Sequence, residues 1–148
     1  TPLPATLDVR AYNHRLAESG MSFLAAPALA AHATKKFPAC LAELPLLAPG
    51  EDSSMRQKLM RWLDKKRLRP KIVGGFGDSA LMSAFGQAGV GVFPVPTIVE
   101  TEIVAAYGVK ALGRSAEART EYFAISAERR VSHPCVLAIT ESARARFA

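Results

Sequence analysis

Two short stretches carry the small polar residues best suited to ligand chemistry. Residues 50–54 and residues 77–79 each follow an apolar stretch and precede a helical pattern. Ligands of parallel α/β sheets usually bind at such strand-to-helix turns, at the carboxyl ends of the strands. The start of the helix offers free N–H groups and a positive dipole end, which suit a small anion or a carboxylate. Plain N-capping explains the same residue types, so both interpretations stay open.

No other motif reaches a catalytic or metal-binding pattern. The run Gly74-Gly75-Phe76-Gly77 resembles a phosphate-binding loop, but it lacks the Lys-Ser/Thr pair and does not complete G-x-G-x-x-G. Close approach of a neighbouring strand explains these glycines as well. The three histidines have no metal-ligand spacing, and no serine lies in G-x-S-x-G. We therefore expect no catalytic residue, no metal site and no cofactor.

The positive charge of the chain is concentrated in one segment. Residues 56–71 contain eight basic side chains and one acidic one, and the rest of the chain is close to neutral, although the whole carries a net charge of +6. A solvated helix face is the ordinary explanation for such a run. A nucleic-acid surface is the alternative. The only aromatic residue within the helical part, Trp62, falls on its apolar side, which disfavours base stacking.

Length and composition indicate a folded chain without a membrane anchor. The 148 residues are 49% hydrophobic and 22% charged, which excludes intrinsic disorder. The two cysteines, Cys40 and Cys135, form no CxxC pair, so we expect a reduced, cytoplasmic protein. No apolar run approaches the length of a membrane helix, and no signal peptide is visible.

Hydrophobic patterning predicts strands that alternate with helices, which is typical of an α/β fold with a largely parallel sheet. The predicted strands are 21–26, 44–48, 71–76, 90–93, 109–112 and 121–127. The predicted helices are 28–36, 38–43, 54–68, 80–88, 96–107 and 133–147. Ser54 and Gln57 have capping-box spacing, Asp78 or Ser79 is expected to cap the next helix, and Gly89 and Gly108 are expected to end helices.

Residues 44–96 resemble the effector-binding domain of LysR-type transcriptional regulators. The order is strand, polar turn, amphipathic helix, strand, second helix, and an apolar strand that ends in proline. Four strings are similar to the subgroup that activates sodium/proton antiporter genes, and they occur in the expected order. The strings are VRAYNH, GDSALMSAFGQAGVGVF, YGVKALGR and YFAISAERRVSHP.

This resemblance implies a periplasmic-binding-protein-like α/β fold with two Rossmann-like subdomains, the first of them incomplete in this sequence. Residues 1–20 would be a crossover segment, 21–104 the second subdomain, and 105–148 the return to the first. The strands missing from the first subdomain should leave an exposed sheet edge and apolar surface. DNA would be bound through an N-terminal winged helix-turn-helix that this sequence does not contain.

The resemblance also implies a ligand site and an oligomer. A small molecule or ion would bind between the subdomains, and the effector domains would form a homo-oligomer without membrane contact. The residues expected at the ligand are Pro49, Ser53, Ser54, Asp78, Ser79, Phe93 and Pro94. Alternatives that stay open are a structural dimerisation module without a ligand, a free-standing solute-binding protein and, last, an enzyme.

Overall fold

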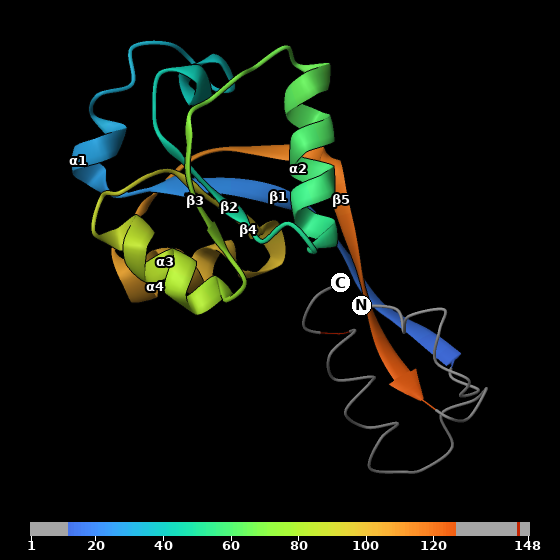
Figure 1. Ribbon diagram of the computed structural model, residues 1–148. Coiled ribbons are helices and arrows are strands. Elements are labelled where there is room, and N and C mark those ends of the chain that lie inside the picture. The colour runs from blue at the N-terminus through green and yellow to red at the C-terminus, as the bar shows by residue number, and fades with distance from the viewer. Residues whose placement is uncertain (1–11, 127–144, 146–148) are drawn as a thin grey trace. The chain divides into compact units, whose positions relative to one another are not determined.

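The computed structural model describes the backbone of residues 12–126 and 145, and the side chains of residues 18–119 and 145. Two compact units divide the chain, one of Gly20–Arg119 and one of Thr1–Ser19 with Thr120–Ala148. The Gly20–Arg119 unit holds most of the described residues (Figure 1). β1 and β5 each continue from this unit into the other one, and the subdomain bounds expected at residues 21 and 104 stay a prediction.

The elements alternate along the chain as strands and helices. The strands are β1 (Tyr12–Ala25), β2 (Leu46–Pro49), β3 (Ile72–Phe76), β4 (Phe93–Pro96) and β5 (Lys110–Ser126). The α-helices are α1 (Pro27–Ala30), α2 (Ser54–Lys65), α3 (Ser79–Gln87) and α4 (Glu100–Tyr107). Two 3₁₀ turns are η1 (Ala39–Ala42) and η2 (Thr97–Val99). The helix expected at 133–147 lies outside the described residues.

The strands form a three-stranded sheet of order β4-β1-β5 and a two-stranded parallel sheet of β2 and β3, whereas one largely parallel sheet was expected. β2 and β3 pair in parallel, and β4 lies antiparallel to β1, which also neighbours β5. The two groups of strands meet at one parallel bridge between Leu46 and Val92, where the Leu47 N–H donates to the Val92 carbonyl at 2.7 Å. The parallel contacts join strands that are connected through a helix, α2 or α3, because parallel neighbours need a crossover connection of this kind.

Side chains that alternate along the strands build a core on each face of the sheet. Phe23 of β1 and Leu46 of β2 belong to the cluster that also contains Trp62 of α2. Leu24 and Leu47, their neighbours in sequence, belong to the second cluster, under α3 and α4. Because successive strand residues point to opposite faces, one sheet supports a helix layer on each side (Figure 1).

Two helix ends follow the local signals, and two do not. Asp78 accepts a hydrogen bond from the Ala80 N–H at 2.8 Å and caps α3, while Gly108 ends α4 with φ +63°. The cap of α2 is Ser53, whose hydroxyl accepts from the Met55 N–H at 3.1 Å, and the expected cap, Ser54, is the first helical residue. The helix that follows Pro27 ends at Ala30, well before the predicted end at 36.

Two strands are longer than their patterns predict. The residue types of Glu18-Ser19-Gly20 predict a turn, but this prediction is wrong, because β1 continues through these residues as an extended strand. A Cβ on Gly20 would lie 2.5 Å from the Ser115 carbonyl oxygen, so this glycine permits the close approach of β5. β5 joins the two strands predicted at 109–112 and 121–127 into one, because pairing with β1 supports the polar residues between them.

Candidate functional site

The β2–α2 turn leads from the end of a buried strand to the capped start of a helix. β2 is buried at every position, so Pro49 marks the point where the chain leaves the core. The Gly50 N–H donates to the Phe76 carbonyl at 2.7 Å, and the Ser53 N–H donates to the Gly50 carbonyl at 2.9 Å. The Arg56 guanidinium donates to the Pro49 carbonyl at 3.2 Å. These bonds fix the turn against the end of β3.

The β3–α3 turn lies next to it, because β2 and β3 are parallel neighbours. Phe76 ends β3, Gly77 follows, and Asp78 caps α3. Ser79 is exposed at the first position of α3, and its carbonyl accepts a hydrogen bond from the Ser83 hydroxyl at 2.9 Å. The two turns picked out by the sequence are therefore neighbours at the same edge of the sheet.

A pocket of about 380 Å³ lies between the two turns, and we call it the turn pocket. Its lining is Pro49, Gly50, Glu51, Asp52, Ser53, Met55, Phe76, Gly77, Ser79 and Met82. An adjoining pocket of about 190 Å³, the α3 pocket, shares Met55, Ser79 and Met82 with it and extends to Pro94 and Tyr107. The turn pocket combines the hydroxyl groups of Ser53 and Ser79 with the acidic side chains of Glu51 and Asp52 and with apolar side chains.

The structure brings together four of the seven residues expected at the ligand. Pro49 and Ser53 line the turn pocket, Ser79 lines both pockets, and Pro94 lines the α3 pocket.

The other three expected residues lie outside both linings. Ser54 points to solvent, and the Asp78 carboxylate is occupied by the cap of α3. Phe93 is fully buried, and its ring lies against Gly86 in the core. Local spacing places a residue near a strand end, but it does not decide which side of the strand the residue faces.

Met55, Phe76 and Met82 line the pockets, although their types did not suggest a ligand role. Met82 is buried, and Met55 and Phe76 are half-buried. The available signal was their position, since each lies within three residues of a turn residue already singled out.

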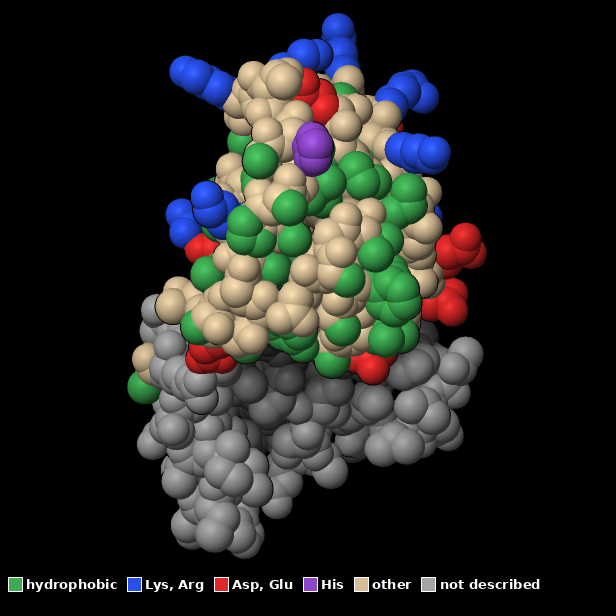
Figure 2. All heavy atoms as spheres, turned by 90° about the vertical axis from the view of Figure 1, so that its left-hand side faces the viewer, with side chains coloured by type: hydrophobic (Ala, Val, Ile, Leu, Met, Phe, Trp, Pro, Cys, Tyr) green, Lys and Arg blue, Asp and Glu red, His purple; other side chains and the backbone are tan. Residues whose placement is uncertain are grey.

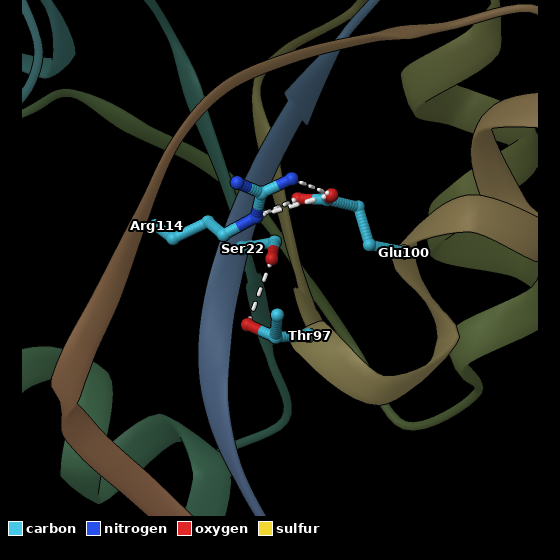
Figure 3. A network of polar contacts seen from close by, with 4 residues as sticks. All are labelled: Ser22, Thr97, Glu100 and Arg114. Carbon is cyan, nitrogen blue, oxygen red and sulfur yellow. Dashed lines mark hydrogen bonds and ion pairs between the residues drawn. The ribbon is translucent and has the colours of Figure 1, made fainter. Parts of the chain in front are cut away.

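A polar network joins four elements beside the sheet (Figure 3). The hydroxyls of Ser22 in β1 and Thr97 in η2 share a hydrogen bond of 2.8 Å. The Arg114 guanidinium of β5 donates from Nε to both carboxylate oxygens of Glu100, at 2.9 and 3.1 Å, and from Nη2 to Oε2. Hydrogen bonding to Arg114 lowers the pKa of Glu100 below its usual range, so this nearly buried group stays ionised.

The described residues do not assemble a metal site or a reactive thiol. No group of three or more His, Cys, Asp or Glu side chains comes together within the described part of the chain. Cys40 is buried as a free thiol, and burial raises its pKa, which disfavours the nucleophilic thiolate. Cys135 lies outside the described residues. None of the helices described is long and apolar enough to cross a bilayer.

Comparison with known proteins identifies relatives along nearly the whole chain. The family described as LysR substrate binding domain matches residues 4–148. The transcriptional activator protein NhaR of Escherichia coli (strain K12) is 37% identical over 135 residues, which cover 91% of this chain and 44% of that protein. NhaR of Shigella flexneri matches to the same extent. The chain thus spans less than half the length of these curated relatives.

Solved structures share the fold. The effector domain of the transcriptional regulator AmpR of Pseudomonas aeruginosa has a TM-score of 0.69 at 22% identity, covering 93% of this chain and 67% of that one. The regulatory domain of HypT from Salmonella typhimurium, in its apo form, has a TM-score of 0.68 at 18% identity, covering 97% and 70%. The expected α/β, periplasmic-binding-protein-like fold is confirmed. Because the family match extends over residues 4–148, the chain belongs to the LysR family and is an effector-binding domain of that family.

Proposed function

We propose that this chain is the sensing part of a LysR-type transcriptional activator, and that a small solute binds at the turn pocket. The likeness to NhaR, a transcriptional activator, supports the activator role. The link to sodium/proton antiporter genes stays an expectation from the four sequence strings. DNA binding would then belong to a helix-turn-helix segment outside this sequence, and the protein would act in the cytoplasm. The proposal assigns no catalytic step to the chain.

The lining of the turn pocket restricts the solute. Glu51 and Asp52 are the charged residues of the lining, and no basic side chain is among them. An anion would therefore rely on main-chain N–H groups, the Ser53 and Ser79 hydroxyls and the helix dipoles. Met55 and Phe76 offer apolar surface on the other side. This combination favours a small organic molecule with one polar end, an apolar body and at most one negative charge.

A ligand bound to a related domain supports this class of solute. An effector binding domain of QuiR is solved in complex with shikimate, which is a small organic molecule with one carboxylate. The observation that carries the proposal is the position of Ser79, whose exposed side chain lines both pockets.

Thermal melting of the 148-residue chain tests the site. The melts would include shikimate and other monocarboxylates, and sodium or lithium against potassium at equal ionic strength. A solute present at 100 times its Kd stabilises the folded state by about 2.7 kcal/mol. That corresponds to a rise in Tm of several degrees for a chain of this size.

Two serine variants identify where the solute binds. Ser79→Ala should weaken binding about tenfold, since it removes one hydrogen bond to a charged ligand. Ser54→Ala is the matched control, because Ser54 is an exposed helix-start serine outside both linings. Equal effects of the two substitutions, or no solute that raises the Tm, would contradict the proposal.

A second candidate function is a dimerisation module with no ligand. The observation that favours it is an apolar strip at the edge of the sheet, where Ile72 and Val73 of β3 are 37% and 43% exposed. Under this alternative the chain associates through that edge, and no solute changes its Tm or its self-association.

A further inference from the structure

The basic residues of α2 do not simply face solvent, because some of them border a pocket shared with β5. Figure 1 shows α2 alongside β5, and the salt bridge from Lys65 to Glu117 confirms that the two elements are in contact. A pocket of about 230 Å³, which we call the α2–β5 pocket, is lined by Lys58, Arg61, Trp62, Lys65, Glu117, Ala118 and Arg119. It shares no residue with the turn pocket or the α3 pocket.

Helical periodicity brings the charges of α2 together. Lys58, Arg61 and Lys65 are separated by three and four residues, so they form one stripe along α2. On β5, Glu117 and Arg119 lie on either side of the buried Ala118 in the sequence, and all three border the pocket. Four of the seven lining residues are cationic, and one is acidic.

The single acid of this pocket is already neutralised. Glu117 binds Lys65 through Oε2 at 2.7 Å and Lys66 through Oε1 at 3.0 Å. These hydrogen bonds lower the pKa of Glu117, so it remains a carboxylate. No carboxylate of the described residues lies within ion-pair distance of Lys58 or Arg61. Their positive charges are thus left for a ligand to balance.

Trp62 gives the pocket a firm apolar side. Its side chain is 5% exposed, and its ring stacks on Phe23 and Phe37 with centroid separations of 5.2 and 6.0 Å. A ring held in this way orients the turns of α2 on either side of it, and so keeps Lys58 and Arg61 near the opening.

We propose that the α2–β5 pocket binds the phosphoryl group of a small molecule. Its volume lies below the range of roughly 300–1,000 Å³ usual for drug-sized ligands, and so suits one tetrahedral group. A phosphoryl group carries about −1.5 to −2 charges at pH 7 and three acceptor oxygens. Arg61 can match two of those oxygens with its planar, bidentate donors, and Lys58 adds a point charge.

The fluorescence of Trp62 measures this binding directly, because it is the one tryptophan in the 148-residue chain. The chain would be titrated with inorganic phosphate and with glycerol phosphate at constant ionic strength, with chloride as the reference anion. We expect saturable changes in emission with phosphate and its ester, and none with chloride. Calorimetric titration gives the Kd without relying on the fluorophore.

Two variants with the same change of charge test the pocket. Arg61→Gln should weaken phosphate binding about tenfold, as expected for a lost charge-assisted hydrogen bond. Arg69→Gln removes one positive charge from an exposed residue outside the lining, and its Kd should stay within about twofold of the parent. Unchanged Tm values for both variants confirm that they fold.

Three outcomes would overturn the proposal. The first is the absence of saturable phosphate binding. The second is equal weakening by Arg61→Gln and Arg69→Gln, which would indicate a diffuse positive potential. The third is binding of a short DNA duplex that inorganic phosphate does not compete for, since the positive face of α2 would then recognise a polyanion instead of a single phosphoryl group.

Discussion

Phe93 fills the space beside Gly86, and this contact sets how closely α3 approaches the sheet. A Cβ built on Gly86 would lie 2.1 Å from the Phe93 ring, which is fully buried and cannot move aside. Glycine at this helical position therefore has a packing reason that outweighs its poor helix propensity. The nearby Gly77 differs, because a Cβ there would meet nothing within 4 Å.

Gly86→Ala should destabilise the fold by about 2–3 kcal/mol, because the extra methyl group overpacks a filled core. Urea unfolding monitored by circular dichroism measures the loss. Gly77→Ala is the matched control, and we expect it to change the unfolding free energy by less than about 1 kcal/mol. If Gly86→Ala left the unfolding free energy unchanged, this would show that α3 can shift away from β4 without a loss of stability.

At the scale of elements, the Glu100–Arg114 pair connects α4 to β5. Glu100 lies in the first turn of α4, where a negative charge also complements the helix dipole. Its side chain is 9% exposed, whereas that of Arg114 is 61% exposed. If the pair breaks, the Glu100 carboxylate is therefore left nearly buried without its counter-charge, whereas the Arg114 guanidinium is still solvated.

Glu100→Gln should lower the Tm at pH 7 by about 2–4 °C. The pKa of Glu100 is lower in the folded state than in the unfolded chain, so its stabilising effect is complete above the unfolded value of about 4.3. The effect is lost as the pH falls through the lower, folded value. The difference in Tm between the parent and Glu100→Gln should therefore shrink in acid.

Thermal melts between pH 7 and pH 3.5 measure the difference in Tm between the parent and Glu100→Gln. Glu51→Gln, at an exposed glutamate of the β2–α2 turn, should leave the Tm nearly unchanged at every pH. A gap between the parent and Glu100→Gln that stays constant over this range would mean that the variant acts through packing and not through the carboxylate charge.

At the scale of the whole molecule, charge and apolar surface lie in different places. Figure 2 shows hydrophobic side chains over the middle of one face, with Lys and Arg side chains at its top and flanks. Among the described residues, the exposed large hydrophobic ones are Ile72, Val73, Leu81, Phe85 and Val90. β3 pairs only with β2 among the described strands, so its other edge offers unpaired main-chain groups along the strand that carries Ile72 and Val73.

If the chain self-associates through β3, Val73→Lys should weaken that association at least about tenfold, because a charge on an exposed edge strand opposes pairing with another copy. Sedimentation velocity over a range of protein concentrations measures the effect. Ala105→Lys adds the same charge at an exposed position of α4 and should leave association unchanged. Parent and Val73→Lys chains that sediment alike would contradict an interface at β3.

Local signals predicted the elements around the candidate site well. Asp78 caps α3 as expected, and Gly89 and Gly108 adopt φ of +83° and +63° where helices end. These features depend on hydrogen bonds within a few residues, which a sequence pattern can express. Gly20 was misread because its role depends on β5, which lies far away in sequence.

The sequence by itself determined the alternation of strands and helices, the two polar turns, the concentration of positive charge near α2 and, through its motifs, the LysR family. Only the tertiary structure decided that Phe93 faces the core, that Ser79 lines two pockets, and that α2 shares a basic pocket with Glu117 of β5. Periodicity and capping are encoded by neighbouring residues. Contacts between distant segments are set by how the helices pack on the two faces of the sheet, and no local pattern contains that information.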